Sequence, residues 1–333
     1  MDMEQEEIQF LGLFGIYKES YKLIFSFWKI FTKITLTLIL PLSFIYLAHM
    51  EVSDFLKRRI WLTEVRLDNT QVGTSRYHKL SDLLSTERDY FILFKVVYFI
   101  FYLILSLLST SAVVYTVACI YTTRNLTFRN VMSVVPKVWK RLMITFLYTF
   151  VAMFAYTVTT ISVIVSIAYF LEDMAGPLLV LTLILYLIGF IYLTVVWNLA
   201  CVISVLEESY GLQAMIKSRT LIKGKILIAM AICVMLNLPL FFVQSMFQRL
   251  VVHGDWRSVG MVDRVCYAIL CFLVLSMLNL FGLVIQTVIY FVCKSYHHEN
   301  IDKIALSNHL EVYLLAEYVP LKSKDVQLEE YRV

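Results

Sequence analysis

Four carboxamide side chains lie in otherwise apolar stretches of the sequence, where they could bind a polar ligand. They are Asn237, Gln244, Asn279 and Gln286. An amide that has left water needs a hydrogen-bond partner, because an unpaired polar group is costly in an apolar medium. Two uses meet this need. The amides join neighbouring helices, or they are intramembrane polar contacts for a small solute.

A second group of polar residues follows the last apolar stretch. It comprises His297, His298 and Glu299, with Asp302 and His309 further on. On a helix His298 and Asp302 would share one face, so a metal ion is sterically possible, although a solvated helix is the alternative that we favour. We therefore predict no metal site and no cofactor.

Catalytic sequence motifs are missing from the chain. The patterns G-x-S-x-G, C-x-x-C, G-x-x-x-x-G-K-[ST] and H-E-x-x-H do not occur. Charged side chains within the apolar stretches are also rare: Lys95 lies near the end of one, and Glu172 and Asp173 form a short turn between two others. We expect Lys95 to extend toward water and the two acids to be solvated or to lie at a pore mouth. The sequence thus predicts a protein that is not an enzyme.

The composition of the chain shows what must position these side chains. Of 333 residues, 60% are hydrophobic and only 16% are charged. A soluble domain has roughly 45–50% apolar and about 25% charged residues. The sequence therefore predicts an all-α integral membrane protein. Its net charge of +4 is too small and too dispersed to indicate nucleic-acid binding.

Apolar windows long enough to cross a bilayer as helices define the expected architecture. A span needs about 20 mainly apolar residues. Six windows qualify, at about 28–49, 91–121, 142–170, 178–206, 226–247 and 265–293. They predict a six-span bundle over residues 28–293, preceded by a cytosolic amphipathic segment, 1–27, and followed by a cytosolic tail, 294–333. Segment 51–90 is expected to be a long polar loop on the opposite side.

Basic residues predict the orientation of the bundle. The connection 122–141 contains five basic and no acidic residues, which places it in the cytosol by the positive-inside rule. Both termini then also lie in the cytosol. The membrane would be an endomembrane (endoplasmic reticulum or secretory pathway) or the plasma membrane. The tail could bind partner proteins, since Tyr318–Leu321 has the Tyr-x-x-apolar pattern of sorting signals.

Two basic segments, 126–143 and 207–225, combine apolar residues at a spacing of three to four with several cations. We predict interfacial helices whose cations contact anionic headgroups of membrane lipids, each contributing on the order of 1 kcal/mol. The alternative is that they only obey the positive-inside bias. The candidate headgroup contacts are Arg129, Lys137, Lys140, Arg141, Lys217, Arg219, Lys223 and Lys225.

Weak internal similarity suggests that the bundle consists of three repeats, each a basic interfacial helix followed by a two-span hairpin. Residues 38–44 read LILPLSF and residues 236–242 read LNLPLFF. A proline removes a helical hydrogen bond and bends the chain. We therefore expect Pro41 and Pro239 to kink the first and fifth spans similarly.

Three stretches resemble a plant family of uncharacterised multi-span membrane proteins, some of which are labelled poly(A)-binding-protein-binding protein. They are EEIQFLGLFGIYKES near the N-terminus, LILPLSF in the first span and CKSYHHENIDKIALSNHLEVYLLAEYVPLK in the tail. The segment EESYGLQAMIKSRTLIKGK is similar to the membrane domain found beside bacterial glycerophosphodiester phosphodiesterases. Neither resemblance implies an activity, a catalytic residue or a ligand.

Two functions follow as hypotheses. The first is a non-enzymatic endomembrane protein that organises lipid or partner proteins through its cytosolic basic helices. The alternative is a carrier for a small neutral or amphipathic solute, and it requires a polar cavity near Asn237 and Asn279.

Overall fold

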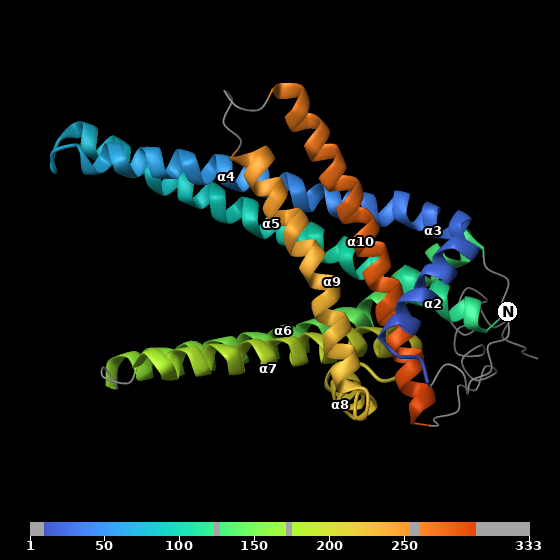
Figure 1. The fold of residues 1–333 in the computed structure, drawn as a ribbon. Coiled ribbons are helices and arrows are strands. Elements are labelled where there is room, and N and C mark those ends of the chain that lie inside the picture. Colours follow the sequence, from blue (N-terminus) through green and yellow to red (C-terminus); the bar gives the residue numbers. More distant parts are fainter. Residues whose placement is uncertain (1–9, 123–126, 171–174, 254–259, 298–333) are drawn as a thin grey trace, which may run out of the picture.

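The computed structural model describes residues 10–122, 127–170, 175–253 and 260–297, and all its regular elements there are helical (Figure 1). The prediction of an all-α fold is confirmed for this part of the chain. The helices are α2 (Leu13–Ser26), α3 (Trp28–Ile34), the π-helical turn η1 (Thr35–Ile39), α4 (Leu40–Asp68), α5 (Ser75–Tyr121), α6 (Phe128–Phe170), α7 (Ala175–Leu206), α8 (Leu212–Leu221), α9 (Ile226–Phe247), the π-helical turn η3 (Gln248–Val252) and α10 (Met261–Tyr296).

Six helical stretches of the described residues are long and apolar enough to cross a membrane, as the sequence predicted. Each predicted window lies in one of these stretches. They are Trp28–Asp68, Ser75–Tyr121, Phe128–Tyr169, Gly176–Leu206, Ile226–Val252 and Met261–Tyr296.

The prediction of a long polar loop over residues 51–90 is wrong. Helix α4 continues to Asp68 and α5 begins at Ser75, so a short connection joins two long helices. At 1.5 Å per residue, the 47 residues of α5 extend about 70 Å, against a hydrocarbon core of about 30 Å. The charged residues of this segment therefore belong to a helical hairpin that is much longer than one span.

Ion pairs between α4 and α5 explain why a charged segment stays helical. Arg59 Nη2 lies 3.1 Å from Glu87 Oε1, and Arg88 Nη2 lies 3.0 Å from Glu64 Oε1. Thr63 Oγ1 also donates a hydrogen bond of 2.9 Å to Glu87 Oε2. Hydropathy shows only that this segment is polar, and it cannot show that the charges pair between two helices. For this reason the sequence predicts a loop here.

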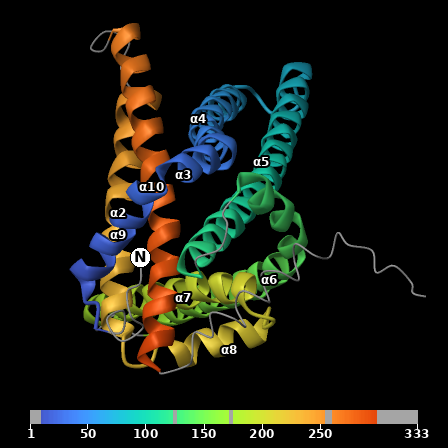
Figure 2. The same cartoon turned by 90° about the vertical axis from the view of Figure 1, so that its right-hand side faces the viewer.

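The long helices form three hairpins, α4–α5, α6–α7 and α9–α10. Figures 1 and 2 show that the hairpins meet at one end and diverge toward the other. We call the meeting point the core end; α2 and α8 also lie there. The three hairpins agree with the predicted number of two-span units. That these units are sequence repeats remains a prediction.

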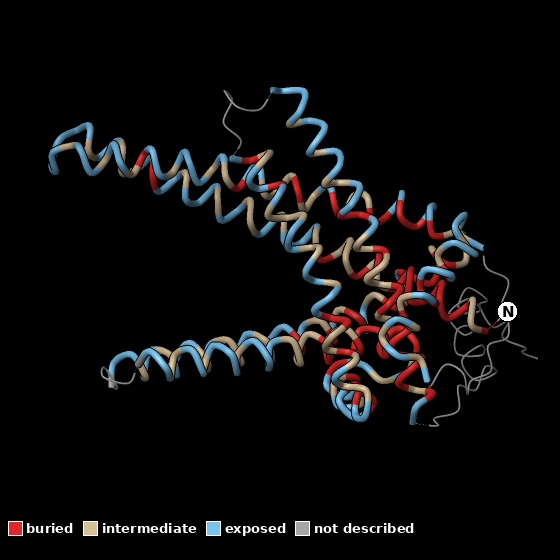
Figure 3. Tube along the Cα trace, viewed as in Figure 1, coloured by how far each residue is buried: buried red, intermediate tan, exposed pale blue. Residues whose placement is uncertain are grey.

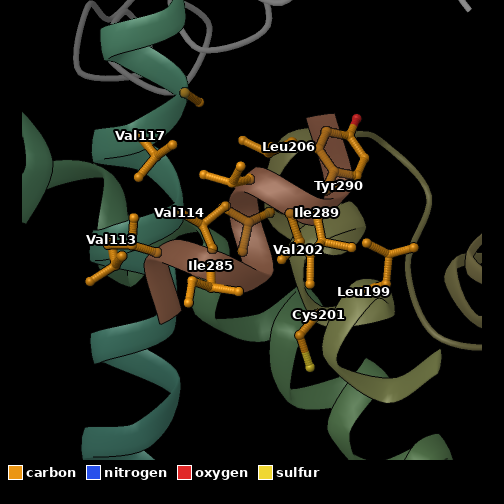
Figure 4. Close-up of a cluster of buried hydrophobic side chains, with 14 of the residues drawn as sticks. Val113, Val114, Val117, Leu199, Cys201, Val202, Leu206, Ile285, Ile289 and Tyr290 are labelled. Atoms are coloured by element: carbon orange, nitrogen blue, oxygen red, sulfur yellow. The ribbon is translucent and has the colours of Figure 1, made fainter. Parts of the chain in front are cut away.

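Buried residues gather mainly at the core end, and the arms of the hairpins are largely exposed (Figure 3). Side chains of α5, α7 and α10 meet there, with Val113, Val202 and Ile285 all fully buried (Figure 4). The exposed arms carry many large apolar side chains, which is the surface that helices in a lipid environment would present.

The apolar side of the predicted interfacial helix 126–143 faces the core. Most of this segment forms the first turns of α6, and five of its apolar residues are at most 2% exposed. They are Val131, Val134, Val135, Val138 and Leu142. The same spacing of three to four residues suits packing against protein as well as lipid, so periodicity alone could not separate the two.

The second basic segment, 207–225, contains the ten-residue helix α8. Ala214, Ser218 and Leu221 are buried in the core, while Leu212 and Ile216 are exposed. Ser218 Oγ donates a hydrogen bond of 2.8 Å to the carbonyl of Val196, which fixes α8 against α7. Helix α8 thus keeps an outward apolar face.

The two prolines have different surroundings. Pro41 is the second residue of α4, which directly follows the π-helical turn η1, whereas Pro239 lies inside α9. Prolines and π turns both mark places where a helix departs from regular α geometry. The expected similarity of the first and fifth spans therefore does not extend to their local helix geometry.

Candidate functional site

A polar cavity of about 200 Å³ lies between the hairpins, beside the core end. Nine side chains with a hydroxyl or carboxamide group, from α5, α7, α9 and α10, line it: Tyr102, Ser106, Ser109, Thr110, Thr194, Asn198, Asn237, Asn279 and Gln286. Among the described residues that line it, none is Asp, Glu, Lys, Arg or His. The cavity is therefore polar without a formal charge.

Three hydroxyl groups in the wall, those of Ser109, Thr110 and Thr194, donate their protons to carbonyl groups of their own helices. Ser109 Oγ donates to the carbonyl of Leu105 at 2.7 Å, and Thr194 Oγ1 donates to the carbonyl of Phe190 at 2.8 Å. The oxygen of such a hydroxyl keeps lone pairs that can accept a hydrogen bond. To a ligand, these hydroxyl groups thus offer hydrogen-bond acceptors. The carboxamide side chains offer both donors and acceptors.

The two central asparagines are anchored to different elements. Asn279 Nδ2 donates to Ser43 Oγ at 3.2 Å, which links α10 to α4. Asn237 Nδ2 donates to the carbonyl of Cys233 at 2.8 Å, within α9 itself. Asn279 thus joins neighbouring helices, the first of the two uses predicted for these amides, but it links the sixth candidate span to the first and not to the fifth. The bond of Asn237 joins no second helix. The oriented carboxamides of both residues edge the same cavity.

The structure brings three of the four predicted amides to this cavity. Gln286 lines it with Asn237 and Asn279, whereas Gln244 is half-buried elsewhere on α9. Sequence analysis missed Asn198 of α7, although it gives the same signal, a carboxamide inside an apolar stretch. Gly282 also lines the cavity, and a Cβ atom added there would meet nothing within 4 Å.

A partly buried ionic cluster joins three elements at the core end. Glu207, which directly follows α7, accepts hydrogen bonds of 2.9 Å from Lys294 Nζ and 2.7 Å from the Tyr290 hydroxyl, both on α10. Its other oxygen lies 2.6 Å from Lys217 Nζ of α8. Burial alone would raise the pKa of Glu207, but hydrogen bonds from Lys217 and Tyr290 and the charge of Lys294 outweigh it and lower the pKa.

The eight predicted headgroup contacts lie on α6, α8 and the segment after α8. Lys217 is engaged by Glu207, so its charge is compensated by protein. Lys225 Nζ lies 5.2 Å from the centre of the Tyr296 ring. The exposed members are Arg129, Lys140, Arg219 and Lys223, and the half-buried ones are Lys137, Arg141, Lys217 and Lys225.

Several predicted features lie outside the described residues. These are Glu172 and Asp173, residues 298–309 of the possible metal cluster, and the tail that we expect to bind partner proteins. Of the cluster, the structure describes His297, whose Nε2 lies 3.0 Å from the carbonyl oxygens of Leu221 and Lys223. A ring N–H there would bind the carbonyl groups at the end of α8.

Comparison with known proteins adds one match. A family model described as a domain of unknown function, DUF8558, matches residues 1–331. No curated protein and no solved structure matches the chain.

Proposed function

The chain belongs to the DUF8558 family, and we propose from its geometry that it is a multi-pass membrane protein that carries a small uncharged polar solute. Both termini would lie in the cytosol, in an endomembrane or the plasma membrane. The solute would bind in the polar cavity without covalent change, so the proposal assigns no enzymatic activity.

The observation that supports this proposal is a polar cavity inside six apolar helical stretches. Amides and hydroxyls that leave water cost free energy unless they find partners, and a bound solute supplies partners. A volume of about 200 Å³ is smaller than the roughly 300–1,000 Å³ of pockets for drug-sized ligands. The uncharged wall favours a neutral solute, because an isolated charge would stay unpaired there.

The closed core end determines how such a carrier would work. On that side of the cavity the hairpins are packed together, and Glu207 ties α7, α8 and α10 through Lys217 and Lys294. Toward the other side the hairpins diverge (Figure 1). The solute would enter between the diverging arms, and its release on the other face would require the core end to loosen.

Filling the cavity tests the proposal. The full chain is reconstituted in liposomes, and uptake of glycerol and of urea is followed by light scattering. Gly282→Leu should reduce uptake several-fold, because its side chain would extend into the open space beside α10. Gly176→Leu, at the far end of α7 and also without neighbours within 4 Å, is the matched control. Uptake no faster than in protein-free liposomes, or equal in wild type and Gly282→Leu, would contradict the proposal.

The second candidate function is organisation of anionic lipid at the cytosolic face, and an exposed stripe on α2 and α3 favours it. Phe14, Tyr21, Phe25 and Trp28 are 57–82% exposed and recur every three to seven residues, so they follow one side of the helices. Exposed lysines accompany them: Lys18, Lys22 and Lys29. Aromatic and basic side chains together suit the headgroup region of a membrane.

Lipid selectivity tests this candidate. The full chain in detergent is mixed with phosphatidylserine or phosphatidylcholine, and the bound lipid is counted by native mass spectrometry. Replacing Lys18, Lys22 and Lys29 by Gln should abolish a preference for phosphatidylserine. The matched control replaces Arg66, Arg76 and Lys79, which are exposed on the distant α4–α5 hairpin. A preference that survives the first set of changes would argue against this role for α2.

A further inference from the structure

A second cavity, of about 170 Å³, lies between α4, α5 and η3, away from the core end. Its polar lining consists of His49, Ser53, Asp54, Lys57, Lys95 and Gln248. This pocket differs in kind from the uncharged polar cavity, because its wall carries two lysines. Sequence analysis expected Lys95 to extend into water, whereas it lines this pocket.

The His49 ring fixes the position of Lys95. Lys95 Nζ lies 2.8 Å from His49 Nε2, and the ring itself stacks on Tyr98 with a centroid distance of 3.6 Å. An ammonium group only donates, so Nε2 must accept and the histidine proton must be on Nδ1. His49 is therefore neutral in this arrangement and adds no negative charge to balance Lys95.

The one carboxylate in the wall is already engaged. Asp54 Oδ2 lies 2.7 Å from Arg58 Nε, and Asp54 Oδ1 lies 3.5 Å from His253 Nε2. Within the described part of the chain, neither Lys57 nor Lys95 has a carboxylate within ion-pair distance. The pocket thus contains two ammonium groups and one carboxylate, and neither ammonium group is paired with an acid of the described residues.

Lys57 and Lys95 line the same small pocket, so two ammonium groups of like charge face one space and repel each other. Repulsion between like charges is relieved when an anion binds between them. We propose that this pocket binds a small oxyanion, a carboxylate or a phosphate group. The lysines supply its charge-assisted hydrogen bonds, and Ser53 and Gln248 stand beside them in the wall.

The bound oxyanion would be either a free ion or part of a lipid headgroup, and both have the same chemistry. The pocket itself selects the oxyanion, because the two ammonium groups keep up to five N–H donors besides the one that Lys95 gives to His49. It does not depend on the proposed solute cavity, since the residues that line the two cavities are different.

The test uses the purified full chain in detergent and measures thermal stabilisation by inorganic phosphate at constant ionic strength, with chloride as the reference salt. We expect a saturable effect of phosphate. Lys95→Gln and Lys57→Gln should each weaken apparent phosphate binding about tenfold or more. Lys79→Gln, an exposed change on the same helix as Lys95, should leave it unchanged. Lys57 is exposed, so its replacement keeps the test informative even if Lys95→Gln fails to fold.

Two results would overturn the proposal: equal stabilisation by phosphate and chloride, or phosphate binding that both lysine variants retain. Competition separates the two sources. Displacement of phosphate by a short-chain phosphatidic acid, but not by the matching diacylglycerol, assigns the site to a lipid headgroup. Saturable phosphate binding without such displacement assigns it to a free oxyanion.

Discussion

Asn279 of α10 donates a 3.2 Å hydrogen bond to Ser43 of α4, two residues that are 236 positions apart in the chain. Ser43 is fully buried, so its hydroxyl has no access to water. The bond joins the first and last candidate spans beside the polar cavity. It therefore serves the packing of the hairpins and orients an amide that a solute could contact.

Asn279→Ala should lower the stability of the folded protein and slow solute uptake. Loss of an interhelical bond of this kind costs about 0.6–2 kcal/mol. Asn237→Ala is the matched control, because its bond lies within α9 and its loss should affect stability less. Thermal unfolding in detergent checks the difference. Equal melting temperatures for the two variants would contradict a role of Asn279 in joining α10 to α4.

Glu207→Gln should destabilise the core end more than loss of a surface acid does. It leaves Lys217 and Lys294 without their shared carboxylate. Because the cluster is only partly buried, with the Glu207 side chain 12% and the Lys217 side chain 34% exposed, a loss of about 1–3 kcal/mol is expected. Glu64→Gln removes a pair that is about half exposed, so a change of about 0–1 kcal/mol is expected. Chemical unfolding of both variants in detergent gives the comparison.

Acid should weaken the core end through Glu207. Its pKa lies below the ordinary value of 4.5, because hydrogen bonds from Lys217 and Tyr290 and the charge of Lys294 stabilise the carboxylate. A lowered pKa contributes stability above the ordinary value, and that contribution is lost as pH falls through the folded-state pKa. Melting temperatures measured from pH 6 to pH 3 should fall more steeply in wild type than in Glu207→Gln. Parallel curves would refute this assignment.

Gly224→Ala should destabilise the turn between α8 and α9. Gly224 has a φ of +91°, a conformation that L side chains rarely adopt, and an added Cβ would collide with the Tyr296 ring. The backbone strain alone costs about 1–2 kcal/mol. Gly176→Ala, in open space on α7, should be nearly neutral. The melting temperature of Gly224→Ala should be lower than that of Gly176→Ala, and equal values would contradict this prediction.

The two faces of the predicted membrane topology can be distinguished by cysteine labelling. In a cysteine-free chain, Val72→Cys and Lys140→Cys introduce exposed thiols at the tip of the α4–α5 hairpin and near the start of α6. A membrane-impermeant reagent should label one of them in sealed vesicles and the other after permeabilisation. Labelling of both from one side would refute the six-span topology.

The sequence predicted the parts of this fold that depend on hydropathy. Six apolar windows became six helical stretches, and Asn237, Asn279 and Gln286 could be placed in a polar cavity because amides are conspicuous among apolar residues. Hydropathy could not show that the charged segment 51–90 is helical. Its stability depends on pairs such as Arg59 with Glu87, whose members are far apart in the chain.

Contacts between distant elements also explain what was missed at the sites. The apolar face of residues 131–142 is amphipathic whether it meets lipid or the core, and only its neighbours α5 and α7 decide. In the sequence, the partners of Glu207 on α10 and of His49 on α5 are far from them along the chain. The two residues become parts of clusters because α10 brings Lys294 to the first and α5 brings Lys95 to the second.

Because the three long hairpins meet at the core end and diverge from it, a small rotation there moves their far ends by a large distance (Figure 1). A rotation of about 5° at the pivot would move the tip of α5, about 70 Å away, by about 6 Å. Small side-chain rearrangements near Glu207 would thus be amplified into large displacements at the far ends of the hairpins. Conversely, a force applied to the tip of α4–α5 would act on the pivot with the mechanical advantage of that long arm.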